Sequence, residues 1–353
     1  MKIAQVSPLY ESVPPQTYGG TERVVAFLTE ELVKGGHDVT LFASGDSVAS
    51  ARLVPVVPRA LRLDPGSVDS LAHHVLMLDR VFRMAAEFDV IHFHIDYVHF
   101  PMSRRAKCPQ VTTLHGRLDI PDLQPLYAEF RDMPVVSISQ SQRAPLPGAN
   151  WRRTIHHGLP SDLFHLQAQP GNYLAFLGRV SPEKRLDRAI EIARRVGLPI
   201  KVAAKIDEAD REYFDKDIAR LLELPFVDFV GEIGEADKQR FLGAARALLF
   251  PIDWSEPFGL VMIEAMACGT PVVAWDEGSV SEVIAPGVSG FIVNTIDEAV
   301  EATAAAMALD RHACRGEFDA RFTAARMARD YLEVYADVIA ATTRARHSPG
   351  QVA

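Results

Sequence analysis

The chain is poor in cysteine and has no long apolar run. Three of its 353 residues are cysteines, Cys108, Cys268 and Cys314, and their wide spacing shows no paired pattern. We therefore do not expect a disulfide framework or a zinc ribbon. No apolar stretch is long enough to span a bilayer, and Met1 leads directly into a core strand instead of a signal peptide. These features predict a cytoplasmic protein with no transmembrane segment, for which only peripheral membrane contact remains possible.

The chain also lacks an excess of basic residues, because its formal net charge is -9. Nucleic-acid binders need a basic surface that displaces counterions from phosphates. Nucleic acid is therefore not an expected partner, and any phosphate site must be built from a few local basic residues. Hydrophobic residues make up 48% and charged residues 24% of the chain, which is typical of a globular protein that folds throughout.

The length and the residue pattern predict two α/β domains. A chain of 353 residues exceeds what one hydrophobic core usually supports. Short apolar runs alternate with amphipathic segments, which is typical of parallel, doubly wound sheets. The pattern lapses in a polar stretch at 162–172 and then restarts. Expected strands are Ile3–Val6, Val39–Ala43, Val90–Phe93, Val111–Leu114, Val135–Ser139, Tyr173–Leu177, Ile200–Ala204, Val227–Val230, Ala247–Phe250, Val272–Trp275 and Phe291–Val293.

The segment Glu256–Pro271 reads as a loop, a helix and a turn between two expected strands. Phe258, Gly259 and Leu260 would present backbone N–H groups at the helix start, where an anion such as a diphosphate is stabilised. Glu256 and Glu264 are eight positions apart and could contact opposite ends of an extended ligand. The alternative is that Glu264 is a solvated helix residue and Glu256 a partner of the helix dipole.

A second cluster, Gly178–Lys184, follows an expected strand. Open α/β sheets bind ligands beyond the carboxyl ends of their strands. The guanidinium of Arg179 and the ammonium of Lys184 suit a diphosphate that gains negative charge in a reaction. A basic turn that pairs with surface carboxylates is the alternative.

These two segments carry a family resemblance. Glu256–Pro271 resembles the donor-binding signature of retaining glycosyltransferase family four, which has the GT-B fold. Gly178–Lys184 matches the arginine and lysine motif of that family, although Arg185 stands where glycine is usual. The resemblance implies two Rossmann-like domains that face each other across a cleft. Their expected limits are 1–165 for acceptor binding, 166–322 for donor binding, and 323–353 for a helix that returns to the first domain.

The resemblance also implies a reaction. A hexosyl-type sugar would move from a UDP-, GDP- or ADP-sugar to an acceptor with retention of configuration, without a metal ion or a cofactor. Arg179 and Lys184 would stabilise the leaving phosphate, Glu256 would hold sugar hydroxyls, and Glu264 would hold ribose hydroxyls. The acceptor stays open among sugars, lipid-linked molecules and small molecules. A nucleotide-sugar epimerase and a non-catalytic nucleotide-sugar-binding protein are the alternatives.

The first half of the chain matches the family less strongly. Tyr18–Glu22 follows the first strand, and Gly19 and Gly20 would let the backbone approach the donor. His115 occupies the position of the family histidine that contacts the donor sugar, so we expect it to position substrate or stabilise charge.

In the second half, Asp276–Glu282 matches the glycine-pair loop of the family only in part, because Ser279 replaces the second glycine. A metal site at His92, His94 and His99 is an alternative that the sequence supports weakly.

Overall fold

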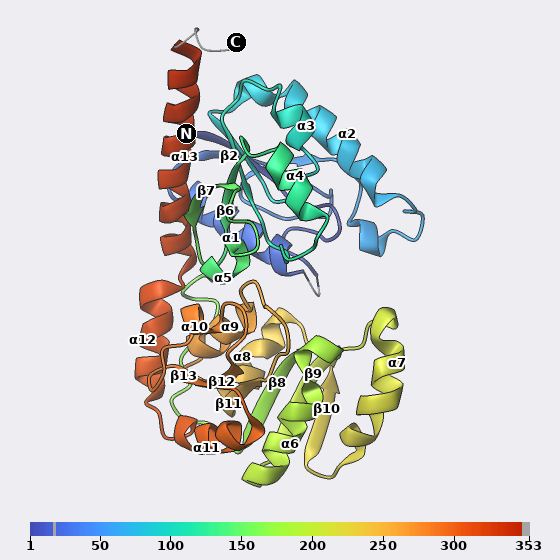
Figure 1. The fold of residues 1–353 in the computed structure, drawn as a ribbon, viewed down its shortest axis with the longest axis vertical. Coiled ribbons are helices and arrows are strands. Elements are labelled where there is room, and N and C mark those ends of the chain that lie inside the picture. Colours follow the sequence, from blue (N-terminus) through green and yellow to red (C-terminus); the bar gives the residue numbers. More distant parts are fainter. Residues whose placement is uncertain (17–18, 348–353) are drawn as a thin grey trace. The chain divides into compact units, whose positions relative to one another are not determined.

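The computed structural model describes residues 1–16 and 19–347, and side chains as far as Arg344. The chain forms two compact units (Figure 1). The first comprises Met1–Gly158 and the segment from Ala324 onward, and the second comprises Leu159–Thr323. The domain limits expected from the sequence, 1–165, 166–322 and 323–353, stay a prediction.

The first unit is built on a parallel sheet of seven strands in the order β3-β2-β1-β4-β5-β6-β7. The five strands expected from apolar runs are confirmed to within two residues at their ends. The edge strands β3 and β7 were not expected, because edge strands are covered on fewer sides and do not need a continuous apolar run. The strands are β1 Lys2–Val6, β2 Asp38–Ala43, β3 Arg52–Pro55, β4 Val90–Phe93, β5 Gln110–Thr113, β6 Pro134–Ser137 and β7 Asn150–Thr154.

Helices join these strands. The amphipathic segment 68–88 forms a helix that is shorter than the segment at both ends, because Asp69 caps the helix by accepting hydrogen bonds from Leu71 and Ala72, and a 3-10 turn follows Arg83. The helices of this unit are α1 Gly20–Lys34, α2 Ser70–Arg83, α3 Phe100–Ser103, α4 Leu123–Glu129, α5 Gln140–Arg143 and α13 Ala324–His347, with 3-10 turns η1 Leu61–Leu63 and η2 Ala85–Glu87.

The last long helix, α13, packs against α1, β4 and β5 of the first unit. Its Tyr331 and Tyr335 side chains are fully buried there. The helical pattern after Asp310 is interrupted at Phe322 and Thr323, between α12 and α13. Residues 348–353, which belong to the C-terminal helix expected from the sequence, lie outside the described residues.

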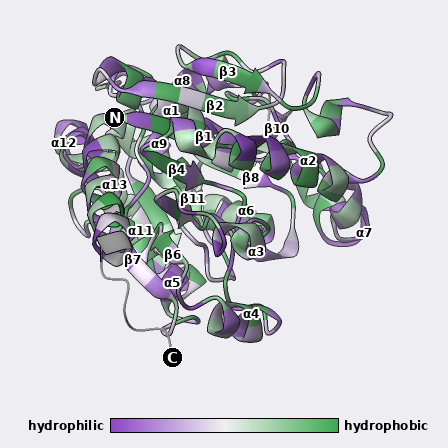
Figure 2. Ribbon diagram, turned by 90° about the horizontal axis from the view of Figure 1, so that it is seen from above, coloured by the Kyte–Doolittle hydropathy of each residue, from purple (hydrophilic) through white to green (hydrophobic). Residues whose placement is uncertain are grey.

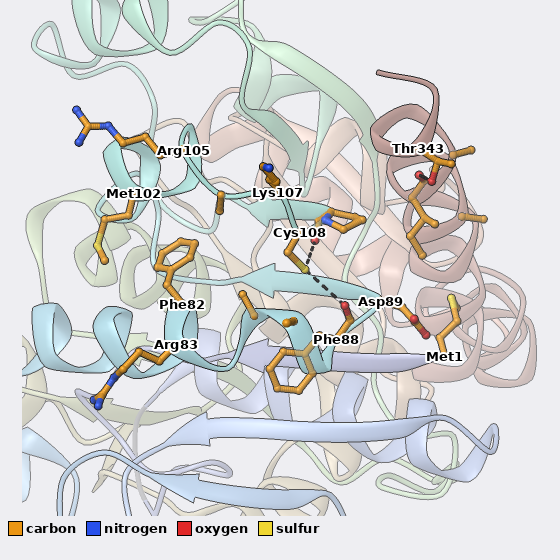
Figure 3. A pocket seen from close by; sticks show the side chains of 17 residues that line it. Met1, Phe82, Arg83, Phe88, Asp89, Met102, Arg105, Lys107, Cys108 and Thr343 are labelled. Atoms are coloured by element: carbon orange, nitrogen blue, oxygen red, sulfur yellow. Dashed lines mark hydrogen bonds between the residues drawn. The ribbon is translucent and has the colours of Figure 1, made fainter. Parts of the chain in front are cut away.

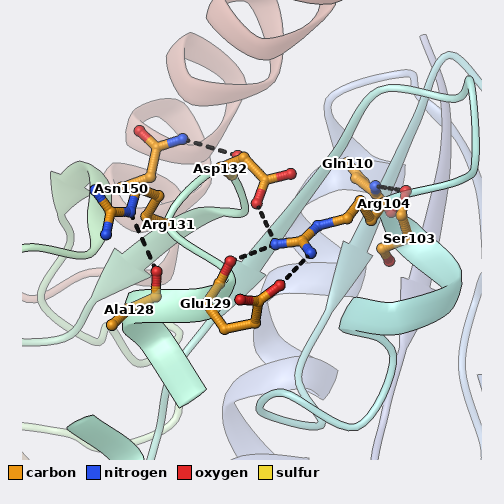
Figure 4. A network of polar contacts seen from close by, with 8 residues as sticks. All are labelled: Ser103, Arg104, Gln110, Ala128, Glu129, Arg131, Asp132 and Asn150. Carbon is orange, nitrogen blue, oxygen red and sulfur yellow. Dashed lines mark hydrogen bonds and ion pairs between the residues drawn. The ribbon is translucent and has the colours of Figure 1, made fainter. Parts of the chain in front are cut away.

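A polar network fastens α3 to α4 (Figure 4). The Arg104 guanidinium donates to the Glu129 carboxylate at 2.7 Å, to the Glu129 carbonyl, and to the Asp132 carboxylate at 2.9 Å. The Gln110 amide donates to the Ser103 carbonyl at 2.8 Å. The hydrogen bonds of this network do not involve His115, so we assign the network a role in stability.

The second unit contains a parallel sheet of six strands in the order β10-β9-β8-β11-β12-β13. All six were expected. Figure 2 shows β4 and β11, which are central in their sheets, mostly in the hydrophobic colour. The strands are β8 Tyr173–Arg179, β9 Ile200–Lys205, β10 Val227–Gly231, β11 Ala245–Phe250, β12 Val272–Trp275 and β13 Gly290–Val293.

The helices of the second unit place the candidate site at the carboxyl ends of β8 and β11. They include α9, which begins at Leu260 after the loop that leaves β11. No helix within the described ranges combines the length and the apolarity needed to cross a bilayer. The helical segments are η3 Pro182–Lys184, α6 Leu186–Val196, η4 Glu208–Asp210, α7 Arg211–Tyr213, the π-helix η5 Phe214–Ile218, η6 Ala219–Glu223, α8 Glu235–Gly243, α9 Leu260–Ala267, α10 Val280–Val283, α11 Ile296–Ala306 and α12 Arg311–Arg321.

Candidate functional site

In the second unit, Lys184 and Glu256 are brought together from positions 72 apart in sequence. The Lys184 ammonium forms an ion pair with the Glu256 carboxylate, and the two side chains are 17% and 12% exposed. The same ammonium lies 5.0 Å from the ring centroid of Trp254 and 5.6 Å from that of Phe250. The aromatic faces stabilise the cation while they shield it from water. A partly desolvated cation attracts an anion more strongly than one in bulk water.

Arg179 ends β8 and is surrounded by carboxylates. Its guanidinium contacts Glu183 at 2.8 Å and both Asp207 and Asp210 at 3.5 Å. A hydrogen bond from Lys205 is the main cause that lowers the pKa of Asp207, with Arg179 adding to it, so this carboxylate is ionised at neutral pH. These ion pairs are the ones expected if Gly178–Lys184 is a basic turn that pairs with surface carboxylates. They also hold the guanidinium at the strand end, where a phosphate could exchange with a carboxylate.

The helix α9 begins with a left-handed residue. Gly259 is its N-cap with φ of 77°, and a Cβ atom there would lie 2.8 Å from Met262 Cε. The Phe258 side chain is only 2% exposed and packs edge-on against Phe322, so it can present only its backbone to a ligand. Glu256 precedes Leu260, the first helical residue, by four positions. Of the two glutamates only Glu264 lies on the helix, so the eight positions between them do not correspond to a helical distance.

The loop Asp276–Glu282 supports the segment that precedes α9. The backbone N–H of Ser279 donates to the Glu256 carbonyl at 3.0 Å, and its hydroxyl donates to the Phe258 carbonyl at 2.8 Å. Gly278 has φ of 59°, and a Cβ atom there would lie 2.3 Å from the Glu256 carbonyl oxygen. Ser279 therefore fastens the loop that carries Glu256, and its N–H is already used within the protein.

Glu264 is buried, with 2% of its side chain exposed. Its carboxylate receives a hydrogen bond from the Lys238 ammonium at 3.0 Å. The alternative in which Glu264 is a solvated helix residue is therefore wrong. The Lys238 ammonium, on α8, also lies 3.6 Å from the Glu235 carboxylate. Lys238 was not predicted as a site residue, because nothing in the sequence around it marks it.

Arg185 adopts the left-handed conformation that glycine takes easily, with φ of 51°. Its guanidinium contacts Asp187 through two hydrogen bonds of 2.7 and 2.9 Å and Asp253 through one of 2.8 Å. These contacts offset the strain of a left-handed non-glycine residue. The substitution of the usual glycine thus preserves the loop shape.

In the first unit, Gly19 and Gly20 lie at the start of α1. Gly19 is the N-cap, and a Cβ atom on it would lie 2.8 Å from the Pro15 Cβ. Its φ of 168° is extended backbone, so Gly19 is needed here for close packing and not for a left-handed turn. Tyr18, which belongs to the same sequence motif, lies outside the described residues.

His115 follows β5 and belongs to a cluster of histidines. Its Nε2 lies 2.9 Å from His94 Nδ1, and its ring stacks on His157 with centroids 5.4 Å apart. The ring is partly accessible, but its Nδ1 is shielded from solvent and has no hydrogen-bond partner in the described part of the chain. Burial lowers the pKa of His115 to about 3, so its ring is neutral at pH 7.

His92, on β4, and His94, just beyond the end of that strand, lie with ring centroids 4.0 Å apart, as their alternation predicts. Both are occupied in hydrogen bonds within the protein, and His99 is bonded to Ser103 and Thr112. Among residues 1–16 and 19–347, no group of three histidine, cysteine or acidic side chains is placed to hold a metal ion.

The first unit also has an apolar groove of about 1170 Å³ at the amino ends of β1, β4 and β5 (Figure 3). Its walls include Phe82, Phe88 and Met102, with Arg105 and Lys107 at its edge. Because His115 follows the opposite, carboxyl end of β5, this groove contains none of the candidate site residues.

Comparison with known families gives the same assignment for both units. Residues 164–320 match the model described as Glycosyl transferases group 1, and residues 18–157 match the model described as Glycosyltransferase Family 4. The chain belongs to glycosyltransferase family 4. It is therefore a retaining glycosyltransferase with the GT-B fold, which transfers a sugar from a nucleotide-sugar donor to an acceptor.

Family members of known name are related to this glycosyltransferase over most of its length. It is 25% identical to D-inositol 3-phosphate glycosyltransferase of Mycolicibacterium smegmatis, over 83% of this chain and 79% of the relative. It is 26% identical to phosphatidyl-myo-inositol mannosyltransferase of the same organism, over 84% and 82%. The crystal structure of AviGT4, a glycosyltransferase of avilamycin A biosynthesis, matches with a TM-score of 0.75 and 25% identity, over 96% and 98%.

Proposed function

We propose that the second unit of this glycosyltransferase binds the donor diphosphate through Arg179 and Lys184. The pair of Lys184 with Glu256 supports this most directly, because it places a shielded cation at the loop that leads into α9. As the bond between sugar and phosphate breaks, the diphosphate gains negative charge. Both cations then stabilise the leaving group more strongly than the bound donor, which lowers the barrier.

The remaining donor contacts follow the course of the chain through α9. Phe258, Gly259 and Leu260 would face the diphosphate with the N–H groups of the helix start, which the helix itself cannot pair. Glu256, once Lys184 turns to the phosphate, can accept hydrogen bonds from sugar hydroxyls. Glu264 would hold the ribose hydroxyls, with Lys238 fixing its carboxylate.

We propose donor contacts for residues of the first unit as well. Gly19 and Gly20 would approach the donor phosphates with their backbone, and His115 would contact the donor sugar. A neutral histidine suits this role better than that of a general base, because its pKa is too low to hold a proton at pH 7. We propose that retention needs no covalent nucleophile and that orientation and charge stabilisation supply the rate enhancement.

We further propose that no metal ion takes part, because Arg179 and Lys184 supply the positive charge that a divalent ion would otherwise bring. Cys108, Cys268 and Cys314 are present as thiols and not as disulfides, which suits the reducing environment of the cytoplasm. The acceptor remains open among sugars, lipid-linked molecules and small molecules. The inositol-containing names of two relatives make inositol phosphates a reasonable first choice for testing.

The experiment that tests this function is calorimetric titration with UDP, GDP and ADP and with their common sugar conjugates. UDP-glucose comes first, because the HepE structure of Anabaena contains that donor. We expect one nucleotide family to bind, equally well with and without a chelator, and binding to weaken in Lys184→Ala. A requirement for a divalent ion would overturn the metal-free proposal. Folded protein that binds none of these nucleotides would overturn the donor site.

A further inference from the structure

A continuous chain of buried hydrogen bonds connects helix α13 to His115 within the first unit. The Gln5 amide nitrogen lies 3.0 Å from the Tyr335 hydroxyl, and the Gln5 amide oxygen lies 2.8 Å from His94 Nε2. His94 Nδ1 lies 2.9 Å from His115 Nε2. Gln5 is on β1, Tyr335 is on α13, and the two histidines follow β4 and β5, so four separate segments of the chain converge on this path. Gln5 and Tyr335 are fully buried and His94 is 2% exposed.

The orientation of the Gln5 amide sets the direction of each hydrogen bond. An amide oxygen can only accept, so the proton between Gln5 and His94 belongs to His94 Nε2. A neutral imidazole carries one proton, which leaves His94 Nδ1 as an acceptor. The proton between the two rings must then belong to His115 Nε2. It follows that His115 Nδ1 carries a lone pair and no proton.

The other side of the path agrees with this direction. The Gln5 amide donates to the Tyr335 oxygen, so the Tyr335 hydroxyl is free to donate to His92 Nδ1 at 2.8 Å. His92 then donates through Nε2 to the Thr113 hydroxyl at 2.7 Å. The hydrogen bonds of this path can therefore all be given consistent directions, and within the described residues the His115 Nδ1 lone pair receives no hydrogen bond.

The hydrogen-bond directions derived above require that the histidine rings are neutral, and burial keeps them neutral. Burial is the main cause that lowers the pKa of His92, His94 and His115, and in His94 the neighbouring histidines add to it. Neutral rings have a defined tautomer, which a charged imidazolium would not have.

We propose that Gln5, His94 and Tyr335 are positioning residues that hold His115 as the Nε2–H tautomer, so that its Nδ1 accepts a hydrogen bond from a hydroxyl of the transferred sugar. The proposal rests on the sugar-contacting role of His115 proposed above. The His115 Nδ1 has no hydrogen-bond partner in the described part of the chain, and an unmade buried hydrogen bond is destabilising by about 1–3 kcal/mol. Nδ1 is covered in the structure, so a side chain over it has to move before a sugar hydroxyl can supply the missing donor.

The first test needs no substrate. Nitrogen-15 histidine spectra of the full chain, with His115 identified by its loss in His115→Gln, report which ring nitrogen is protonated. We expect Nε2 protonated and Nδ1 unprotonated in the wild type. Gln5→Leu should produce a mixture of tautomers. A protonated Nδ1 in the wild type, or a Gln5→Leu spectrum identical to the wild type, would overturn the proposal.

Tyr331→Phe is the matched control. Tyr331 lies one helical turn before Tyr335 on α13 and bonds to the Thr113 hydroxyl at 2.8 Å, outside the path from Gln5 to His115. Both tyrosine variants lose one buried hydroxyl and should lose similar stability. Only Tyr335→Phe should alter the His115 tautomer, because it frees the Gln5 amide to rotate. Equal effects of the two variants on the tautomer would point to general loosening and would overturn the positioning role.

The second test separates sugar contact from nucleotide contact. The affinities of UDP and UDP-glucose are compared in the wild type and in Gln5→Leu, or those of GDP with GDP-mannose or ADP with ADP-glucose if the wild type binds that pair more tightly. We expect the nucleotide sugar to bind about tenfold more weakly in the variant and the nucleoside diphosphate to be unchanged. Equal weakening of both ligands would overturn the proposal. If the wild type binds none of them, the proposed donor site fails, while the spectra still decide the state of His115.

Discussion

The two clusters of candidate residues hold their polar groups in opposite ways. In the second unit, Arg179, Lys184 and Glu256 are charged, partly exposed and joined in ion pairs. In the first unit, His94 and His115 are neutral and joined by hydrogen bonds that involve a buried glutamine. Partly exposed ion pairs can exchange partners, because water compensates the ions while they separate. The buried neutral network keeps its pattern and offers a directed lone pair. The comparison teaches that one unit is suited to a change in charge and the other to orientation.

The largest expected effect is a difference in acid stability between the units. Burial lowers the pKa of His99 and His115 to about 3, from 6.5 in the unfolded chain. A folded state that binds protons less readily loses stability as pH falls below 6.5. The loss is about 2 kcal/mol per such buried histidine by about pH 5. Asp96, with its pKa raised to about 6, has the opposite sign and offsets about 1 kcal/mol.

In the second unit, the loss of folding stability at low pH depends mainly on carboxylates. The pKa values of Asp187 and Asp207 are lowered, so the stability they contribute is lost only below about pH 3.8. Hydrogen exchange followed by mass spectrometry, corrected for intrinsic rates, should show β4 and β5 losing protection between about pH 7 and pH 5 while β8 and β11 keep theirs. Loss of protection in both sheets at the same pH would contradict the comparison.

The next effect is on turnover. Lys184→Ala should lower turnover about a hundredfold, by analogy with the loss of one group that stabilises a developing negative charge. Steady-state kinetics with the donor found by titration checks it. Arg194→Ala is the matched control, because Arg194 lies in the same unit, is 58% exposed and pairs with Glu191 on its own helix. Wild-type turnover in Lys184→Ala would remove this lysine from the catalytic role.

Glu264→Gln should have a smaller effect that is confined to nucleotide binding. The glutamine keeps the size of the side chain and can still accept from Lys238, but it loses the charge that attracts ribose hydroxyls. We expect about tenfold weaker binding of the nucleoside diphosphate by calorimetry, which is about 1.4 kcal/mol. Turnover at saturating donor should change less than about twofold. Unchanged affinity would remove Glu264 from the ribose role.

The smallest effect is expected for Arg185→Gly. Glycine relieves about 1–2 kcal/mol of left-handed strain, while the lost contacts with Asp187 and Asp253 are each worth up to about 1 kcal/mol. The free energy of urea unfolding should therefore change by less than about 1 kcal/mol. Arg185→Ala keeps the strain and loses the contacts, so it should be the less stable variant. The reverse order would show that the guanidinium does not hold this turn.

Much of the fold was readable from local sequence. Apolar runs such as Val90–Phe93 and Val272–Trp275 predict buried parallel strands, and they are confirmed at the same residues. The edge strands β3 and β7 escaped prediction because partial exposure removes the apolar run on which the inference depends. The limits of α2 also escaped, since they depend on the cap at Asp69 and on a turn beyond Arg83.

The residues of the candidate site also fall into those that the sequence predicts and those that it does not. Arg179, Lys184, Glu256 and Glu264 could be selected from the sequence because their motifs are short and contiguous. Lys238, Ser279 and the path from Tyr335 to His115 could not be selected. Each of these depends on contacts between segments that are distant in sequence, and no local pattern encodes the distance between two side chains.

Local sequence is enough to assign the family, the alternation of strands and helices, and the residue types available to hold a phosphate. How those groups are held depends on the tertiary structure. It decided that Lys184 is paired with Glu256 and shielded by aromatic rings, that Glu264 is buried against Lys238, and that His115 is neutral with one nitrogen unpaired. The reason is that charge state and hydrogen-bond direction depend on burial and on the nearest partner in space. Both are set when distant segments of the chain pack together.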